Sequence, residues 1–239
     1  MLHLQIGDLH VEIIRKQVRH LRLSVRRPGG TIHVAAPLRT PEATIRELVL
    51  QKQTWIRKHQ AIYQAQAPEP TLNYLTGETH YYQGRALHLH VQEQAGRPQV
   101  ALVGDELHLH VPPGTTPAQR AQVLARWHRT QLQALIPQLL AKWEPIVGAQ
   151  SAAWGIKHMK TRWGTCSIRA RRIWLNLELS KWPLPCLEYV VVHELVHLHE
   201  RLHNARFWAL VAQAMPTWQA PHQALRRGSL ATVAASWAD

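Results

Sequence analysis

Residues 189–198 read YVVVHELVHL, and this stretch decides the fold. His193 and His197 lie one helical turn apart, so both imidazoles project from one face of a helix and can share a zinc ion. Glu194 is offset by about 100° around the helix, where a carboxylate can act as a base without binding the metal. The H-E-x-x-H spacing therefore predicts a metal-dependent hydrolase.

A third metal ligand must come from outside this motif, because a catalytic zinc ion usually has three protein ligands and an open position. We expect the motif to lie on a helix from about Leu184 to Arg201. His203 follows His197 by six residues, so it reaches the metal only if the helix ends near its predicted limit and the chain turns. Asn204 tolerates such a turn. We choose His203 as the third ligand and keep His222 as the alternative.

Positive charge is concentrated in two parts of the chain. The 239 residues carry 28 Lys+Arg against 15 Asp+Glu, a formal net charge of +13. Residues 1–65 carry 11 basic and 4 acidic side chains, and residues 151–182 carry 7 and 1, whereas residues 183–239 carry 4 and 4. A focused basic surface attracts anions. Segments 15–27 and 157–172 therefore predict contacts with nucleic acid or a nucleotide.

Composition excludes several classes of protein. With 46% hydrophobic residues the chain can bury a core, so global disorder is excluded. We expect neither a transmembrane helix nor a signal peptide, because an apolar run of about 18 residues and a basic leader are both missing. Cys166 and Cys186 do not make a disulfide framework. Together these features predict a cytoplasmic protein without membrane contacts.

The first third of the chain reads as strands followed by a helix. LHLQI, HVEIIR, LRLSVR and TIHVAA alternate apolar and polar residues, which is typical of half-buried strands. Thr40 as N-cap and Pro41 at the first helical position then predict a helix to about residue 65. Residues 65–72, AQAPEPTL, are predicted to form a loop.

A similar unit follows, which hints at duplication. Strand-like HYYQG, ALHLHVQE, PQVALVG and ELHLHVPP precede Thr116 and Pro117, where a second helix is expected to begin. This helix is predicted to be kinked or ended at Pro137 and otherwise to reach about Trp143.

Two pairs of histidines alternate along these predicted strands, His88 with His90 and His108 with His110. Each pair lies on one face of its strand and can bind metal. The simpler interpretation is that they are polar residues of a solvated sheet face.

The last third resembles a known family. RWGTCS at 162–167, RIWLNLEL at 172–179, YVVVHELVHL at 189–198 and HNARFW at 203–208 resemble the YgjP-type metallopeptidase domain, which is related to the SprT and WLM families of minimal zinc peptidases. LRLSVRRPGGTIHVAAP and WIRKH, nearer the start, also resemble YgjP-type proteins. The resemblance thus covers almost the whole chain.

The resemblance implies a fold and a zinc site. It implies zinc bound by His193, His197 and His203, with Glu194 as the catalytic base. The implied fold is α+β, a zincin-like minimal metallopeptidase with an active-site helix, a backing helix and a small sheet, preceded by a strand-rich module containing a helix. The corresponding domains are 1–65, the first strands plus helix; 66–150, a second strand-rich segment plus helix; and 151–239, the metallopeptidase core.

The expected activity is cleavage of peptide bonds. RWGTCS and RIWLNLEL would form a hairpin over the active-site helix, and an extended peptide can add to its edge as a strand. The residues expected to contact substrate are Arg162, Trp163, Thr165, Trp174 and Asn176. Tyr189 and His222 are candidates for stabilising the oxyanion.

Two alternatives remain for the substrate. A cationic cleft beside a metal also suits a nucleotide, whose phosphoanhydride bond would be hydrolysed. A basic surface also suits a DNA-associated protease or binding protein. In that case phosphates would meet a set of basic side chains, namely Arg15, Lys16, Arg19, Arg22, Arg26 and Arg27.

Overall fold

The computed structural model contains two compact units, Met1–Thr71 and Leu72–Asp239. The residues that it describes are 2–26, 29–64, 72–227 and 229–236. Residues 65–71 of the predicted loop, and Arg27 of the basic segment, lie outside them. Both units combine helices with sheets, so the α+β class is confirmed. The three-part domain division stays a prediction.

The first unit is a four-stranded sheet with two helices. Its elements are β1 (Leu2–Ile6), β2 (Leu9–Arg15), β3 (Arg22–Arg26), β4 (Thr31–Ala36), α1 (Glu42–Gln51) and α2 (Gln53–Gln64). The strand order is β1-β2-β4-β3, with β2 and β4 parallel. Alternate strand residues such as Val11 and Ile13 form a core with Ile45 and Val49 of α1. The apolar residues that alternate in the sequence therefore form the inner face of this sheet.

The single helix predicted from Thr40 to about residue 65 is wrong in two respects. Its start is shifted because Arg15 Nη1 donates to the Thr40 carbonyl at 2.7 Å. Pro41 instead takes the N-cap position in an extended conformation, without a side-chain hydrogen bond. The helix is also interrupted at Lys52, whose N–H is shared between two carbonyls of the preceding turn. The helix propensities of the residues in this segment do not predict either contact.

The second unit begins by repeating this topology. Its first elements are β5 (Thr79–Tyr82), β6 (Arg85–Glu93), β7 (Gln99–Val103), β8 (Glu106–Val111) and α3 (Pro117–Val147). The strand order β5-β6-β8-β7 has the same pairing directions as the first sheet, with β6 and β8 parallel. The shared topology agrees with the duplication that the sequence hints at.

The helix α3 begins as predicted and continues further than predicted. Thr116 is its N-cap and forms a reciprocal capping box with Gln119. Pro137 lies inside the helix, so the interpretation that the helix ends there is wrong. A proline in a helix costs about 3 kcal/mol, but Ile136 and Trp143 are among buried residues on both sides of it that join the main core. Neither α3 nor another helix in the described ranges combines the length and apolarity needed to cross a bilayer.

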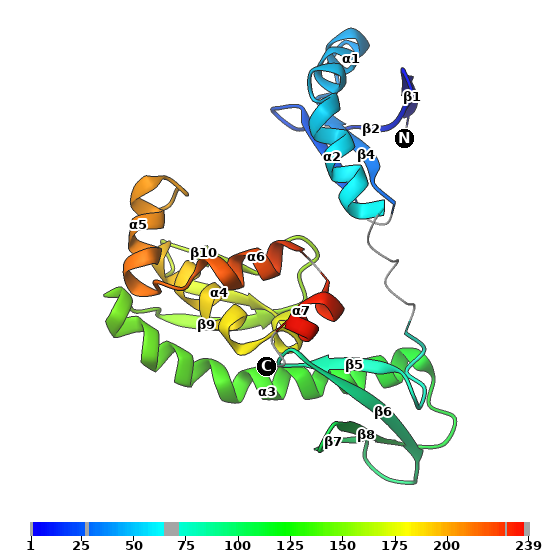
Figure 1. Cartoon of the computed structure of the whole chain (residues 1–239), viewed down its shortest axis with the longest axis vertical. Helices are drawn as coiled ribbons and strands as arrows, with labels where there is room; N and C mark the ends of the chain where they lie inside the picture. Colours follow the sequence, from blue (N-terminus) through cyan, green and yellow to red (C-terminus); the bar gives the residue numbers. More distant parts are fainter. Residues whose placement is uncertain (1, 27–28, 65–71, 228, 237–239) are drawn as a thin grey trace. The chain divides into compact units, whose positions relative to one another are not determined.

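The remainder of the second unit surrounds one buried helix. Its elements are β9 (Ala153–Lys157), β10 (Gly164–Ser167), β11 (Arg172–Asn176), the 3₁₀ helix η1 (Leu177–Lys181), α4 (Leu184–Val196), α5 (Ala205–Ala214), α6 (Gln219–Arg227) and α7 (Leu230–Ser236). The three strands form a sheet of order β10-β11-β9, which leaves β10 at an edge. The helix α4 contacts α3, α5, α6 and β10 (Figure 1). The H-E-x-x-H segment thus occupies the centre of this part.

The strand predicted for RRIWLNLEL is too long. The predicted hairpin is present, with β10 antiparallel to β11. The strand ends at Asn176, because the Asn176 side chain accepts the N–H of Glu178 and caps η1. The LEL segment therefore belongs to the 3₁₀ helix.

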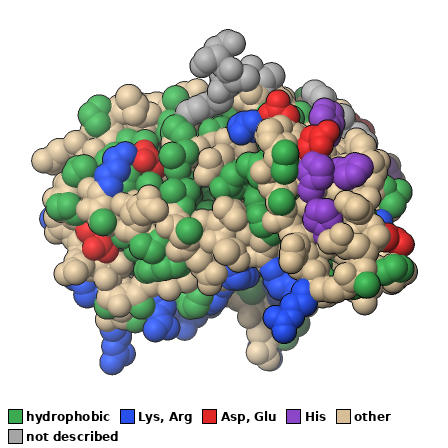
Figure 2. All heavy atoms as spheres, turned by 90° about the horizontal axis from the view of Figure 1, so that it is seen from below, with side chains coloured by type: hydrophobic (Ala, Val, Ile, Leu, Met, Phe, Trp, Pro, Cys, Tyr) green, Lys and Arg blue, Asp and Glu red, His purple; other side chains and the backbone are tan. Residues whose placement is uncertain are grey.

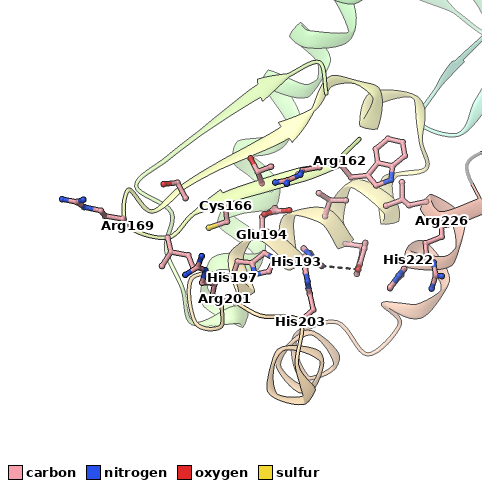
Figure 3. A pocket seen from close by; sticks show the side chains of 18 residues that line it. Arg162, Cys166, Arg169, His193, Glu194, His197, Arg201, His203, His222 and Arg226 are labelled. Atoms are coloured by element: carbon pink, nitrogen blue, oxygen red, sulfur yellow. Dashed lines mark hydrogen bonds between the residues drawn. The ribbon is translucent and has the colours of Figure 1, made fainter. Parts of the chain in front are cut away.

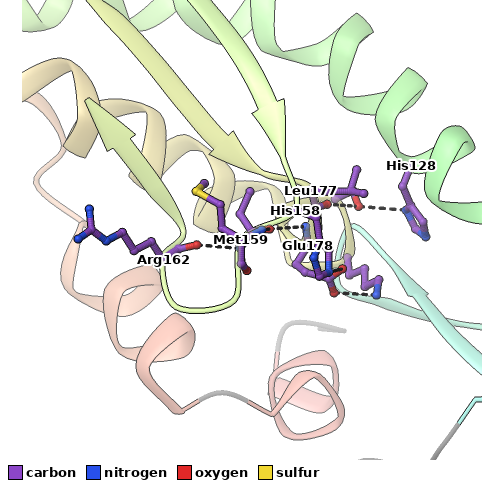
Figure 4. Close-up of polar contacts among 9 residues, drawn as sticks. His128, His158, Met159, Arg162, Leu177 and Glu178 are labelled. Carbon is purple, nitrogen blue, oxygen red and sulfur yellow. Dashed lines mark hydrogen bonds and ion pairs between the residues drawn. The ribbon is translucent and has the colours of Figure 1, made fainter. Parts of the chain in front are cut away.

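A buried histidine ties α3 to η1. His128 is 4% exposed, and its Nδ1 lies 3.0 Å from Ser180 Oγ (Figure 4). The Ser180 hydroxyl gives its only proton to the Leu177 carbonyl, so Nδ1–H of His128 donates to the hydroxyl. Burial, and then the charges of Lys181 and His80, lower the pKa of His128 to about 3.

We predict that acid destabilises the protein through His128. Below about pH 6.5 and above about pH 3, the unfolded chain binds a proton at this side chain and the folded chain does not. Stability therefore falls as the pH falls, by about 2 kcal/mol between about pH 7.5 and about pH 5. Urea unfolding at both pH values measures the loss. His128→Asn, which keeps a donor for Ser180, should reduce it, and the exposed His88→Asn should not. An equal loss in wild type and His128→Asn would contradict this assignment.

Candidate metal centre

The helix α4 carries two of the predicted ligands and is buried on most sides. Its apolar residues, including Val191, Val192 and Leu195, are fully buried in the main core. His193 and the C-cap residue His197 stay half-buried and line a cavity. Because helices, strands and the 3₁₀ helix η1 all pack against this helix, the two imidazoles are held on a rigid support.

The chain reverses direction directly after α4. The predicted helix to Arg201 is wrong, because α4 ends at Val196. His197 Nδ1 lies 3.0 Å from the Glu200 carbonyl, a contact that folds the next turn back. Asn204 then caps α5 by accepting the N–H of Phe207 at 3.0 Å. The earlier reversal allows His203 to return toward α4.

Three histidine rings converge as a result. One ring nitrogen from each of His193, His197 and His203 lies within 4.8 Å of the others (Figure 3). The Nε2 atoms of His193 and His203 are 3.0 Å apart, close to the roughly 3.3 Å expected between two nitrogens of a tetrahedral zinc ion. No other group of three candidate ligands meets this criterion in the described part of the chain. The donor set therefore fits a metal ion.

In two of the three rings, those of His193 and His197, the Nδ1 atom has a hydrogen-bond partner. Tyr189 Oη lies 3.3 Å from His193 Nδ1, and the Glu200 carbonyl lies 3.0 Å from His197 Nδ1. Such contacts fix the tautomer and leave Nε2 for a metal. Burial, and then the neighbouring His197, lower the pKa of His193 to about 3, so its ring is the neutral form that a metal binds.

Glu194 is a buried carboxyl group beside this cluster. It is 4% exposed, and its buried Oε2 has no hydrogen-bond partner among the described residues. Burial raises the pKa of Glu194 to about 8, against the opposing charge of Arg162. A Cβ atom at Gly164 of β10 would lie 2.5 Å from Glu194 Oε1. Gly164 is therefore required for the carboxyl group to occupy this place, and the glycine in RWGTCS was the sequence signal for it.

A cavity of about 1020 Å³ opens over the cluster. Of the residues predicted to contact substrate, Arg162, Trp163 and Thr165 line it, and so do Tyr189 and His222. Trp174 and Asn176 do not. The residues at the cavity that were not predicted include Gly164, Ser167, Ile168, Arg169, Arg201 and Arg226.

Trp174 packs on the small sheet. A Cβ atom at Gly155 would lie 2.4 Å from the Trp174 ring, so the indole covers that glycine. Lys157 Nζ lies 3.6 Å from the ring centroid, in a cation–π contact. Trp174 and Lys157, which belongs to the predicted basic segment 157–172, thus contact each other.

Asn176 holds the loop that precedes β10. Its Nδ2 donates to the carbonyls of Met159 (2.8 Å) and Arg162 (2.7 Å), and its Oδ1 accepts from the N–H groups of Met159 and Glu178 (Figure 4). All four hydrogen-bonding positions of the buried amide are used. Asn176 therefore positions Arg162 at the cavity rather than lining it.

The two oxyanion candidates lie in one aromatic stack. The rings of Tyr189 and His222 are 5.5 Å apart and nearly parallel, and Trp208 and Trp218 continue the stack. Tyr189 is already engaged with His193. His222 Nδ1 is buried without a hydrogen-bond partner within the described ranges.

The predicted histidine pairs of the second sheet do share one face. His90 on β6 is paired with His108 on β8, with ring centroids 5.1 Å apart, and His108 contacts Glu106. Figure 2 shows histidine side chains gathered beside acidic ones on the surface. They do not bring three ligand atoms within 4.8 Å of one another. The solvated-face interpretation therefore fits them better.

Similarity to a known protein family extends over most of the chain. The family model described as YgjP-like, metallopeptidase domain matches residues 19–228. Among solved structures, a match is the crystal structure of the metallopeptidase zymogen of Pyrococcus abyssi abylysin, at 22% identity and a TM-score of 0.35. It covers 38% of this chain and 90% of that one. None of the curated proteins matches the chain.

We predict that Gly164→Ala displaces Glu194 and leaves the histidine cluster intact. The added methyl group would collide with the carboxyl group, not with an imidazole. A shift of about 1 Å in a reacting group can cost about a hundredfold in rate. Peptide hydrolysis should fall by that order, while the bound metal, measured by elemental analysis, should stay as in wild type. Full activity in this variant would show that the close approach has no functional importance.

Proposed function

The chain belongs to the YgjP-like metallopeptidase family, and on this premise we propose that it cleaves peptide bonds with a zinc ion and with Glu194 as general base. The supporting observation is the convergence of His193, His197 and His203 next to a buried carboxyl group with a free oxygen. Three imidazoles leave a fourth zinc position open for chemistry. The proposed fold is zincin-like, with α4 as the active-site helix, α3 packed behind it and β9–β11 as the small sheet.

The position of each side chain around the histidine cluster indicates its role in the proposed hydrolysis. Zinc held there would supply Lewis acidity, lowering the pKa of a water molecule and polarising the scissile carbonyl. Glu194 lines the cavity, takes the proton of the attacking water and passes it to the leaving amine. Gly164 keeps the carboxyl group against β10, and Tyr189 and the Glu200 carbonyl hold their imidazoles in orientation.

The substrate backbone is proposed to pair with β10. Among the described strands it has a partner on one side only, and Thr165, Cys166 and Ser167 line the cavity. An extended peptide can use the free edge for main-chain hydrogen bonds. Tyr189 and His222 both line the cavity and both remain candidates for oxyanion stabilisation, since a Tyr189 hydroxyl that accepts from His193 Nδ1–H keeps its own proton to donate.

Nucleotide hydrolysis remains the second candidate. Four arginines line the cavity, and guanidinium groups bind phosphates as well as carboxylates. A DNA-associated role has less support, because Arg15 is bonded to the carbonyls of Leu38 and Thr40, and Arg171 to that of Gln150. Pyrophosphate release from nucleoside triphosphates, measured beside casein cleavage, separates the first two activities.

We predict that Glu194→Gln abolishes casein cleavage and keeps the metal. The amide cannot accept the proton, and general-base catalysis contributes about 10²- to 10⁴-fold. Glu188→Gln is the matched control, since Glu188 lies on the same helix and pairs with Lys142 outside the cavity. Cleavage by Glu194→Gln at the wild-type rate would overturn the assignment of the base.

A further inference from the structure

The cavity wall has an unusual distribution of charge. Arg162, Arg169, Arg201 and Arg226 line it, and the single acidic residue among the lining side chains is the buried Glu194. The surface that a substrate meets is therefore strongly cationic. A concave site with charge of one sign focuses its field and concentrates the opposite charge.

Within the described ranges these arginines form no ion pair with a carboxylate, in contrast to others in the chain, although the charge of Arg162 acts on Glu194. Arg46, Arg57, Arg85 and Arg120 each form an ion pair with a carboxylate. None of the four arginines at the cavity does. Their guanidinium groups remain available for an anion that enters.

The four side chains come from separate elements and are spread along the cavity. Arg162 precedes β10 and lies over Glu194, and Arg201 follows α4 and lies beside His197 (Figure 3). Arg169, in the turn after β10, marks one end of the cavity, and Arg226 on α6 marks the other. Positive charge thus flanks the histidine cluster on both sides.

This arrangement favours carboxylates on an extended chain over a compact polyphosphate. A nucleoside triphosphate needs donors that converge on adjacent phosphates, often from a glycine-rich loop. Here the guanidinium groups come from four separate places, with Arg162 before β10, Arg169 after it, and the other two on segments outside the sheet. Side chains of an added strand project at regular intervals, and the planar guanidinium fork matches a carboxylate.

We propose that the cavity selects extended peptide segments with Asp or Glu on both sides of the scissile bond. Arg169 binds the carboxylate on one side of that bond, and Arg226 binds the carboxylate on the other side. This inference rests on the peptidase function proposed above for the same site. It names the substrate class of that site as acidic peptides.

Peptide binding to the Glu194→Gln protein tests the selectivity without turnover. The probes are fluorescent peptides of equal length with acidic residues on one side, on the other, on both, or on neither, and a lysine version. The doubly acidic peptide should bind at least about tenfold more tightly than the neutral one, and the lysine peptide most weakly. The preference should shrink at high salt.

Substitution of one arginine at a time then shows which arginine binds the acidic residue on each side of the scissile bond. Arg169→Gln and Arg226→Gln, made in the Glu194→Gln background, should each weaken binding of a different singly acidic peptide by about twofold to fivefold. Both side chains are exposed, so folding should be preserved. The control is Arg126→Gln, which removes an equally exposed positive charge from α3 outside the cavity and should leave the preference unchanged.

Each outcome has a defined meaning. Equal binding of acidic and neutral peptides, or equal losses in the Arg126→Gln control, would overturn the proposal. Displacement of the acidic peptide by a single-stranded oligonucleotide of equal charge at lower concentration would also overturn it, in favour of nucleic acid. Wild-type cleavage of neutral and acidic peptides at equal rates refutes the selectivity alone. Selective binding with no cleavage of any peptide supports the selectivity and refutes the peptidase function.

Discussion

The histidine cluster depends on the reversal of the chain between α4 and α5. Had the helix continued, His203 would have been carried away from His193 and His197. Instead the helix stops at Val196, and the contact of the His197 ring with the Glu200 carbonyl shapes the turn. Hydrogen bonds and caps of this kind contribute about 1 kcal/mol each. Their importance here is geometric, because they bring in the third imidazole.

A second constraint joins the helix to the strand above it. Glu194 can lie against β10 only because residue 164 has no side chain. Asn176 holds the loop before that strand, and so sets where Arg162 enters the cavity. The Glu194 carboxyl group, the strand edge and the cationic wall are consequently parts of one packed arrangement. A substitution in β10 should therefore alter all three features.

Sequence periodicity predicted most of the strands because these follow from alternation and burial, whereas the α+β class came from the family resemblance. The spacing of His193, Glu194 and His197 needed only helical geometry. The features that were missed arise from contacts between distant residues. Arg15 shifts the start of α1, buried neighbours carry α3 past Pro137, and Gly155 receives the Trp174 ring. No local pattern encodes such contacts.

The central claim is that three histidines hold one zinc ion, with His203 delivered by the reversal. Elemental analysis of the purified protein and of His203→Ala tests it most directly. We expect about one zinc ion per wild-type chain and a loss of most of it in the variant, with the fold retained by circular dichroism. Full zinc content in folded His203→Ala, or none in wild type purified without chelator, would show that these three histidines do not form a zinc site.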